Sequence, residues 1–244
     1  MNEVTNLIKN HMSIRRFLDK NIECEKIDEI IQCAQMAPTS SHFQAYTIIE
    51  VKDRQKREVL FNASGKQNWI LNAPLVLLFC GDLHRAEAYF EGIDKDVLQN
   101  TEAYTVATID ASLAAQNTVV AAESLGLGCV VVGGIRNDVE GISKEFKLPD
   151  MVFPLYAVCY GYPDDVPGLK PRLPQRAIHK VDCYDEAEDS MLINQFDDTV
   201  RDYYVKRTNG KTNESWTQRC GKQLMAKPRY EVGYFFRKIG LLKK

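Results

Sequence analysis

The sequence predicts an α+β fold in which helices cover both faces of a central sheet. Four short apolar runs, rich in β-branched residues, are typical of buried strands, and helical patterns separate them. The runs are residues 46–51, 75–80, 129–132 and 155–160. The C-terminal third has helical periodicity without a strand pattern. We therefore expect a three-layer core followed by a helical extension.

The bulk composition is that of an ordinary globular chain. Its 244 residues are 45% hydrophobic and 26% charged, enough for one sizeable core. A net charge of −2 gives no general attraction to nucleic acid or membrane, so we expect neither as a partner. The seven cysteines lack C-x-x-C spacing and suggest reduced thiols of a cytoplasmic protein, without a metal site. We see no signal-peptide pattern and no apolar run of eighteen residues.

Amphipathic patterns predict short helices in the first half of the chain. Ile27, Ile30, Ile31 and Ala34 follow the i, i+3, i+4, i+7 spacing of one helix face. The predicted helices are residues 3–10, 25–36 and 53–62, the last capped by Asp53, and residues 83–103 are a polar, partly helical surface segment.

The segment HMSIRRF, residues 11–17, follows the first helix. In an extended chain alternate side chains share a face, so His11, Ser13 and Arg15 point the same way. Imidazole, hydroxyl and guanidinium groups all donate hydrogen bonds, which suits an anion. A solvated loop with incidental polar residues is the alternative interpretation.

Polar residues also gather after Pro38, which ends the second helix. Thr39, Ser40 and Ser41 offer small hydroxyl groups, and Gln67 lies in a second polar loop. Such groups suit hydrogen bonds to the edge of a flat heteroaromatic ring, although an ordinary turn is the commoner case.

Residues 106–125 form a predicted helix that is apolar or small nearly all round. A surface helix carries a charged face, so this one is expected to be buried in the core or against another subunit. Gly126 and Gly128 end it, and a buried strand then runs into Gly133-Gly134, where backbone N–H groups lie open to a ligand. Asn137 is the predicted N-cap of the next helix, to about Phe146.

Residues 162–174 contain four prolines, which predict a stiff extended connection. Lys170 and Arg172 flank one proline and would project on the same side, where their mutual repulsion favours an anion between them. Two solvated charges are the alternative. The predicted C-terminal helices cover residues 191–207, 213–225 and 228–240.

Several common enzyme classes lack support in the sequence. No G-x-G-x-x-G, G-x-x-x-x-G-K-[ST] or G-x-S-x-G motif is present, which argues against a Rossmann domain, a P-loop NTPase and an α/β-hydrolase. The four histidines are scattered, without metal-ligand spacing or a catalytic triad.

Five segments, taken together, carry a family resemblance. They are HMSIRRF (11–17), APTSSHFQ (37–44), Gln67, AAESLGLGCVVVGGIRN (121–137) and GYP…GLKPRLP (161–174). This combination resembles the oxygen-insensitive NADPH nitroreductase and flavin reductase branch of the nitroreductase superfamily, over essentially the whole chain. The resemblance implies a homodimer of α+β subunits with a mixed central sheet, holding two non-covalent FMN molecules at the interface. It also implies ping-pong hydride transfer from NADPH to FMN, followed by two-electron reduction of a nitroaromatic compound, a quinone or free flavin.

The resemblance also implies roles for single residues. The phosphate and ribityl chain of FMN would be held by His11, Ser13, Arg15, Lys170 and Arg172. The ring would be bound by Thr39, Ser40, Ser41, Gln67, Val132, Gly133 and Gly134. The 2′-phosphate of NADPH would be recognised by Arg207, with Lys206 as a weaker candidate. No catalytic side chain is needed, since the flavin carries the chemistry.

By resemblance the chain is one nitroreductase-like domain over residues 1–244. Residues 1–175 would be the FMN-binding core, and residues 176–244 a helical extension that wraps the dimer. Met12, Thr212 and His42 depart from the family pattern. Two alternatives stay open: an FMN-binding protein without turnover, and a superfamily relative with different redox chemistry.

Overall fold

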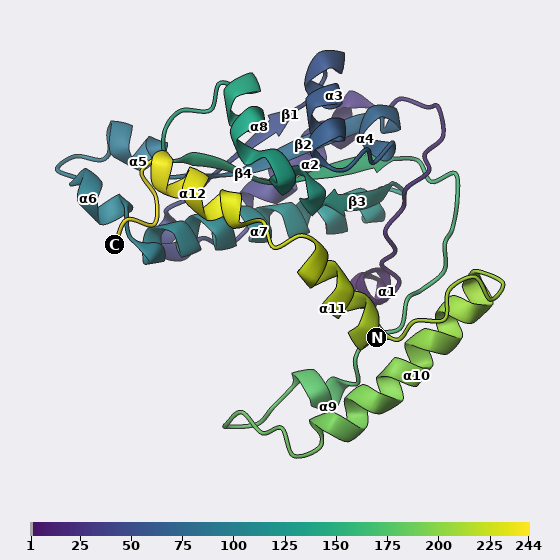
Figure 1. Ribbon diagram of the computed structural model, residues 1–244. Coiled ribbons are helices and arrows are strands. Elements are labelled where there is room, and N and C mark those ends of the chain that lie inside the picture. The colour runs from purple at the N-terminus through teal and green to yellow at the C-terminus, as the bar shows by residue number, and fades with distance from the viewer. Residues whose placement is uncertain (1) are drawn as a thin grey trace. The chain divides into compact units, whose positions relative to one another are not determined.

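The computed structural model describes residues 2–244, which form two compact units (Figure 1). The first unit extends to Pro167 and includes Arg229–Lys244, and the second unit is Gly168–Pro228. The predicted division after residue 175 assigned all later residues to the extension. In the structure the last helix belongs instead with the core unit, because its aromatic side chains are buried there.

The first unit is built on a four-stranded sheet with the order β1-β2-β4-β3. Its strands are β1 (Tyr46–Glu50), β2 (Leu75–Asp82), β3 (Gly128–Val132) and β4 (Val152–Gly161), each within three residues of the predicted bounds. All three strand pairs are antiparallel. A mixed sheet was expected. Within residues 2–244 the parallel component is one isolated bridge, between Ser13 and Cys129.

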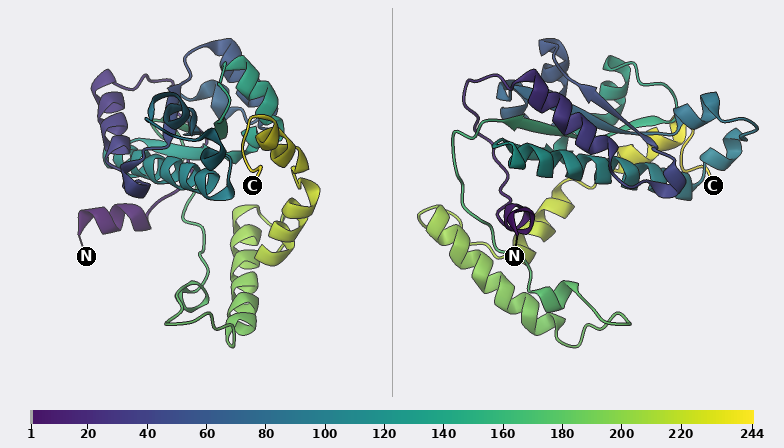
Figure 2. Two further views of the ribbon diagram at one scale, coloured as in Figure 1. Left: turned by 90° about the vertical axis from the view of Figure 1, so that its left-hand side faces the viewer. Right: turned by 180° about the vertical axis from the view of Figure 1, so that it is seen from behind.

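One face of the sheet packs against two helices, α2 (Cys24–Gln35) and α7 (Thr101–Ser124). Alternate residues of β2, represented by Leu77, meet Ile30 of α2 and Ala122 of α7 in one buried cluster. The two helices also lie against each other (Figure 2, right: α2 in purple, α7 in teal).

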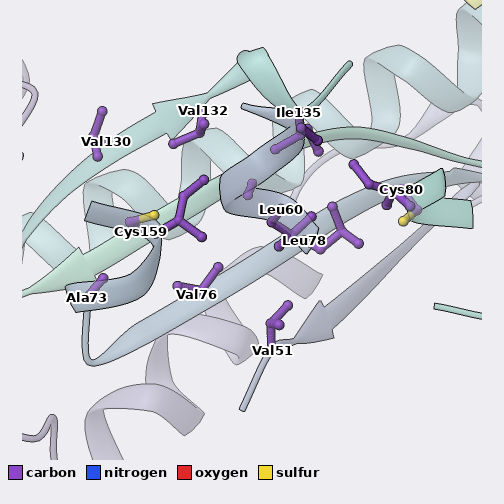
Figure 3. Close-up of a cluster of buried hydrophobic side chains, with 14 of the residues drawn as sticks. Val51, Leu60, Ala73, Val76, Leu78, Cys80, Val130, Val132, Ile135 and Cys159 are labelled. Atoms are coloured by element: carbon purple, nitrogen blue, oxygen red, sulfur yellow. The ribbon is translucent and has the colours of Figure 1, made fainter. Parts of the chain in front are cut away.

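The opposite face packs against α3 (Arg54–Ala63), α4 (Trp69–Asn72) and α8 (Val139–Glu145). Val76, Leu78 and Cys80 of β2 point into this second cluster, together with Leu60 and Ile135 (Figure 3). Every residue of β2 is buried, because successive side chains enter different layers. The predicted three-layer arrangement is confirmed.

The remaining helices of the first unit are short apart from α12 (Tyr230–Lys238), whose Phe235 and Phe236 join a third buried cluster with Phe153. They are α1 (Glu3–Lys9), the 3₁₀ turn η1 (Ser40–His42), α5 (His84–Tyr89), α6 (Lys95–Leu98) and the 3₁₀ segment η2 (Gly133–Asp138). No helix of residues 2–244 is long and apolar enough to cross a membrane.

Two predicted helix caps have different outcomes. Asp53 caps α3 as expected, accepting from the backbone N–H groups of Gln55 and Lys56. The predicted cap at Asn137 was wrong, because Asp138 accepts from Gly141 and begins α8. The Asn137 side chain donates instead to the carbonyl of Ala63.

The second unit consists of α9 (Gln175–Ile178), α10 (Asp189–Arg207) and α11 (Trp216–Ala226). The rings of Phe196 and Trp216 meet with centroids 5.7 Å apart, which joins α10 to α11. Both long helices match their predicted ranges to within three residues.

Candidate functional site

The segment that carries His11, Ser13 and Arg15 lies along β3. The Ile14 amide donates to the carbonyl of Cys129 at 2.8 Å, and Ser13 forms a parallel bridge with the same residue. Ile14 is buried, His11 and Ser13 are half-buried, and Arg15 is exposed. Ile14 therefore enters the core, while His11, Met12, Ser13 and Arg15 stay at least partly accessible.

Arg15 lies at the far end of this segment. Its guanidinium donates to the carbonyl of Ser13 at 3.2 Å and lies 5.6 Å from the ring centroid of Trp69. A guanidinium over an indole face is a cation–π contact, which limits the positions that the charge can take. Trp69 begins α4 and follows Gln67 by two residues, so this contact brings Arg15 close to the second predicted polar loop.

Gln67 and Gly134 lie directly against each other. The Gln67 side-chain amide donates to the carbonyl of Ser64 at 2.9 Å. A Cβ atom on Gly134 would come within 2.7 Å of the Gln67 Nε2 and of the Ser64 carbonyl oxygen. Gly134 is therefore required by close packing, and the structure brings these two predicted ring contacts together.

The turn after β3 has a cation beside it. Val132 is buried, and a Cβ on Gly133 would lie 3.0 Å from the Arg136 guanidinium. Arg136 donates to the carbonyl of Leu155, and burial lowers the pKa of this arginine. Both glycines remain half-exposed, so their backbone is accessible to a ligand.

The loop of Thr39, Ser40 and Ser41 is held by a residue that we did not single out from the sequence. Asp110 of α7 is 1% exposed, and its carboxylate accepts the amides of Ser40 and Ala45 at 3.1 and 3.0 Å. Its signal in the sequence was an acidic residue in an otherwise nearly uncharged stretch of helix.

The same loop has unusual backbone geometry. Ser41, His42 and Gln44 have positive φ values of 48°, 60° and 54°, a left-handed conformation that costs energy for residues other than glycine. Such conformations persist where surrounding contacts impose them, and they are common at functional sites. The two hydrogen bonds to Asp110 supply that constraint here.

His11 is held by a second acidic residue of α7. Its Nδ1 lies 2.6 Å from the Glu123 Oε1, and the Glu123 side chain is 12% exposed. Asp110 and Glu123 are thirteen positions apart, which corresponds to about 20 Å along a helix. The His11 segment and the Thr39–Ser41 loop are thus attached to the end and to the middle of one rigid helix.

Lys170 and Arg172 belong to the second unit. Both are exposed, and the Arg172 guanidinium donates to the carbonyl of Lys170 at 2.9 Å. They line a cavity of about 440 Å³ whose other walls include Phe196, Tyr204 and Trp216. The guanidinium of Arg219 lies 4.2 Å from the Tyr204 ring centroid and adds a third cation to the lining.

Lys206 and Arg207 occupy the last turn of α10 and are exposed. The Arg207 guanidinium donates to the Tyr203 hydroxyl and lies 5.8 Å from that ring's centroid. Tyr203 also lines the cavity of the second unit. Arg207 therefore contacts one of the aromatic residues that line this cavity.

Comparison with known proteins decides the family. A model described as "Nitroreductase family" matches residues 8–162, and one described as "Nitroreductase family, C-terminal domain" matches residues 170–244. The chain belongs to the nitroreductase family. An FMN reductase (NADPH) of Bacillus subtilis (strain 168) is 39% identical to this chain over 249 residues, and the alignment covers 100% of both chains.

Solved structures of the nitroreductase family have the same fold. The NfrA1 nitroreductase from B. subtilis aligns with a TM-score of 0.96 at 38% identity, covering 99% of this chain and 100% of that one. An NADPH:FMN oxidoreductase from Vibrio harveyi, complexed with NAD⁺, aligns with a TM-score of 0.89 at 31% identity and covers both chains fully.

Proposed function

We propose that this nitroreductase-family protein is an FMN-dependent NADPH oxidoreductase that reduces small electron-poor acceptors. The observation that carries the proposal is the course of β3. Its second residue, Cys129, is hydrogen-bonded to the segment that carries His11, Ser13 and Arg15. Its last residue, Val132, leads into Gly133-Gly134 beside Gln67. Anion donors and ring-edge donors therefore lie along one strand, as a flavin mononucleotide requires. Full-length relatives named as FMN reductases support the assignment.

The chemistry of these residues fits FMN. A phosphate needs several donors, and His11, Ser13 and Arg15 supply three, to which we add Lys170 and Arg172. The flavin ring needs donors and acceptors at its edge, which the Gln67 amide and the glycine N–H groups supply. We also assign to the ring edge the buried Val132 and the hydroxyls of Thr39, Ser40 and Ser41.

When bound, FMN supplies the hydride acceptor and donor that no side chain of the protein can replace. The chain's own contribution is positioning and electrostatics. Arg15 is a permanent cation held against Trp69, and a fixed positive charge beside the cofactor favours the accumulation of negative charge there. Asp110 holds the ring-edge loop in one conformation, so its donors need little reorganisation.

We assign recognition of the NADPH 2′-phosphate to Arg207, assisted by Lys206. The aromatic contact with Tyr203 pre-orders the Arg207 guanidinium, and a bidentate guanidinium suits a terminal phosphate. NADH lacks this phosphate, so the contact would add nothing to the binding of NADH.

We further propose a homodimer in the cytoplasm. Three apolar side chains are exposed: Ile109 (50%) and Leu113 (39%) of α7, and Val131 (52%) of β3. No exposed charged residue lies between Ile109 and Leu113 on α7. Exposed apolar surface of this kind is typical of a subunit interface. All seven cysteines are free thiols, which suits a reducing compartment.

The test is a reconstitution of the purified protein with FMN. We expect a yellow protein with saturable FMN binding, whose flavin absorbance is lost when NADPH is added without oxygen. It should return on addition of a nitroaromatic compound or a quinone. A protein that takes up no FMN would overturn the proposal, whereas one that binds FMN and does not react with NADPH would be a binding protein without turnover.

A further inference from the structure

Glu123 occupies an unfavourable position for a carboxylate. It lies in the last turn of α7, where the helix ends through the left-handed Gly126, whose φ is +79°. The C-terminus of a helix carries partial negative charge, and the Glu123 side chain is only 12% exposed. A carboxylate in such a position needs a hydrogen-bond donor close by.

Two donors reach the same oxygen of Glu123. The Cys129 Sγ lies 3.9 Å from Oε1. Burial, and to a smaller extent the nearby Glu123 charge, raises the pKa of this thiol well above its usual range. Cys129 therefore keeps its proton and is only a weak donor. His11 is the strong partner, with its Nδ1 2.6 Å from Oε1.

The three residues do not form a metal site. Their ligand atoms all lie within 4.8 Å of one another, a spacing that permits a shared ion. A tetrahedral zinc ion with bonds of about 2.0 Å would hold nitrogen and oxygen about 3.3 Å apart. The His11 and Glu123 atoms are closer, at 2.6 Å, which is the distance of a short hydrogen bond.

This hydrogen bond fixes the proton on one ring nitrogen of His11. An ionised carboxylate only accepts, so Nδ1 must carry the hydrogen. The opposite nitrogen, Nε2, is then an acceptor in the neutral ring and a donor in the doubly protonated ring. A fully ionised phosphate also only accepts, so His11 can bind Glu123 and such a phosphate together only in the doubly protonated form.

We propose that Glu123 is a positioning residue for the phosphate end of the cofactor. It orients His11 and keeps a proton on Nδ1, so that the ring presents Nε2 to the phosphate. Through His11 it selects flavins that carry a 5′-phosphate over riboflavin. The inference rests on the proposed function, because it concerns the site that we assign to FMN.

The test compares two ligands that differ only in the phosphate. Flavin-free wild-type protein and the variants Glu123→Gln and Glu123→Ala are titrated with FMN and with riboflavin, followed by flavin fluorescence. We expect the Kd for FMN to rise about tenfold in Glu123→Gln and at least as much in Glu123→Ala, which corresponds to one charge-assisted hydrogen bond. The Kd for riboflavin should change less than twofold. Glu102→Gln, at an exposed position of the same helix, is the matched control.

Two further measurements separate positioning from general stability. In a His11→Gln background the Glu123→Gln change should no longer affect FMN binding, because the two residues act as one unit. In flavin-free protein, ¹⁵N NMR of the histidine rings should show a protonated Nδ1 on His11, an assignment that Glu123→Ala removes.

Equal weakening of FMN and riboflavin binding by Glu123→Gln would overturn the inference, as would no change in either. A wild-type protein that binds neither flavin would instead overturn the proposed function.

Discussion

The hydroxyl groups of Thr118 and Tyr160 lie 2.5 Å apart in the core between α7 and β4, and both residues are completely buried. Thr118 also donates to the carbonyl of Ala115 at 2.6 Å, so it must accept from the tyrosine. Burial raises the pKa of Tyr160, which therefore keeps the proton that it donates.

Thr118→Val is expected to destabilise the protein by about 1–3 kcal/mol, because it leaves the Tyr160 hydroxyl buried without an acceptor. Urea denaturation measures the change. Tyr160→Phe in the Thr118→Val background should recover part of the loss, since no polar group is then left unpaired. A fully additive double variant would contradict the interpretation.

Gly134→Ala is expected to destabilise the first unit by about 1–3 kcal/mol, because the new Cβ would overlap Gln67 and Ser64. Gly221→Ala is the matched comparison, and it is expected to stabilise the protein. A Cβ there meets nothing within 4 Å, and alanine stabilises the interior of α11 by up to about 1 kcal/mol. Thermal unfolding of both variants, followed by circular dichroism, compares them. Tolerance of alanine at Gly134 would show that this turn is not closely packed.

Asp110→Asn is expected to release the loop of residues 39–45. An asparagine side chain has one acceptor oxygen where the carboxylate has two, so the Ser40 and Ala45 amides cannot both be satisfied. The loss should be about 1–3 kcal/mol, with faster hydrogen exchange at these two amides. Glu102→Gln on the same helix should leave the exchange rates unchanged. Unaltered protection in Asp110→Asn would mean that other contacts hold the loop.

Glu23 is expected to make stability depend on pH in the acid range. The Tyr162 hydroxyl donates to the Glu23 carboxylate at 2.5 Å and lowers its pKa to about 2, with smaller contributions from Lys20 and Lys26. Because the folded pKa lies below that of the unfolded chain, the stabilisation is complete above about pH 4.3. It is lost as the pH falls toward 2.

The variant Glu23→Gln should therefore be less stable than the wild type at pH 7, and the difference should shrink at pH 3 and below. Denaturation at both pH values tests this, with Glu25→Gln as a control for net charge in the same helix. A difference that stays constant with pH would contradict the role of the ionised carboxylate.

Arg207→Ala is expected to raise the KM for NADPH about tenfold or more, because a charge-assisted contact with the 2′-phosphate is worth about 1.5–3 kcal/mol. The KM for NADH should stay within about twofold. Steady-state kinetics with both nicotinamides measures the split. Arg201, another cation of α10, is paired with Asp198, and its alanine variant should show no such split. An equal effect on both coenzymes would remove the assigned role of Arg207.

The fold could be predicted from the sequence because its signals are local. The strands at residues 75–80 and 155–160 are apolar throughout, and the helix at residues 25–36 repeats isoleucine at helical spacing, so each was found within a few residues. The Asn137 cap was wrong because an adjacent residue, Asp138, offers the same chemistry. Which of two neighbouring caps is used depends on tertiary contacts such as that of Asn137 with Ala63.

The site was only partly predictable. His11, Gln67 and Gly134 were predicted by residue type and by family resemblance, and their assignment to the site stays a prediction. Asp110 and Glu123 were missed because their partners, Ser40 and His11, are 70 and 112 residues away in the chain. Periodicity carries no information at such distances. The signal that the sequence did contain was an isolated charged residue in an apolar helix, and both Asp110 and Glu123 are such residues.

The placement of α12 has a consequence for how the chain is made. Phe236 and Leu241 are buried in one cluster with Leu83 and Phe153. In the sequence, the whole second unit lies between β4, which carries Phe153, and the segment that carries Phe236 and Leu241. During synthesis the nascent chain therefore carries an unfinished core until residue 241 has emerged from the ribosome. Until then the apolar surface around Phe153 stays partly open to chaperones and to other nascent chains, so the risk of aggregation persists until α12 has packed against the core.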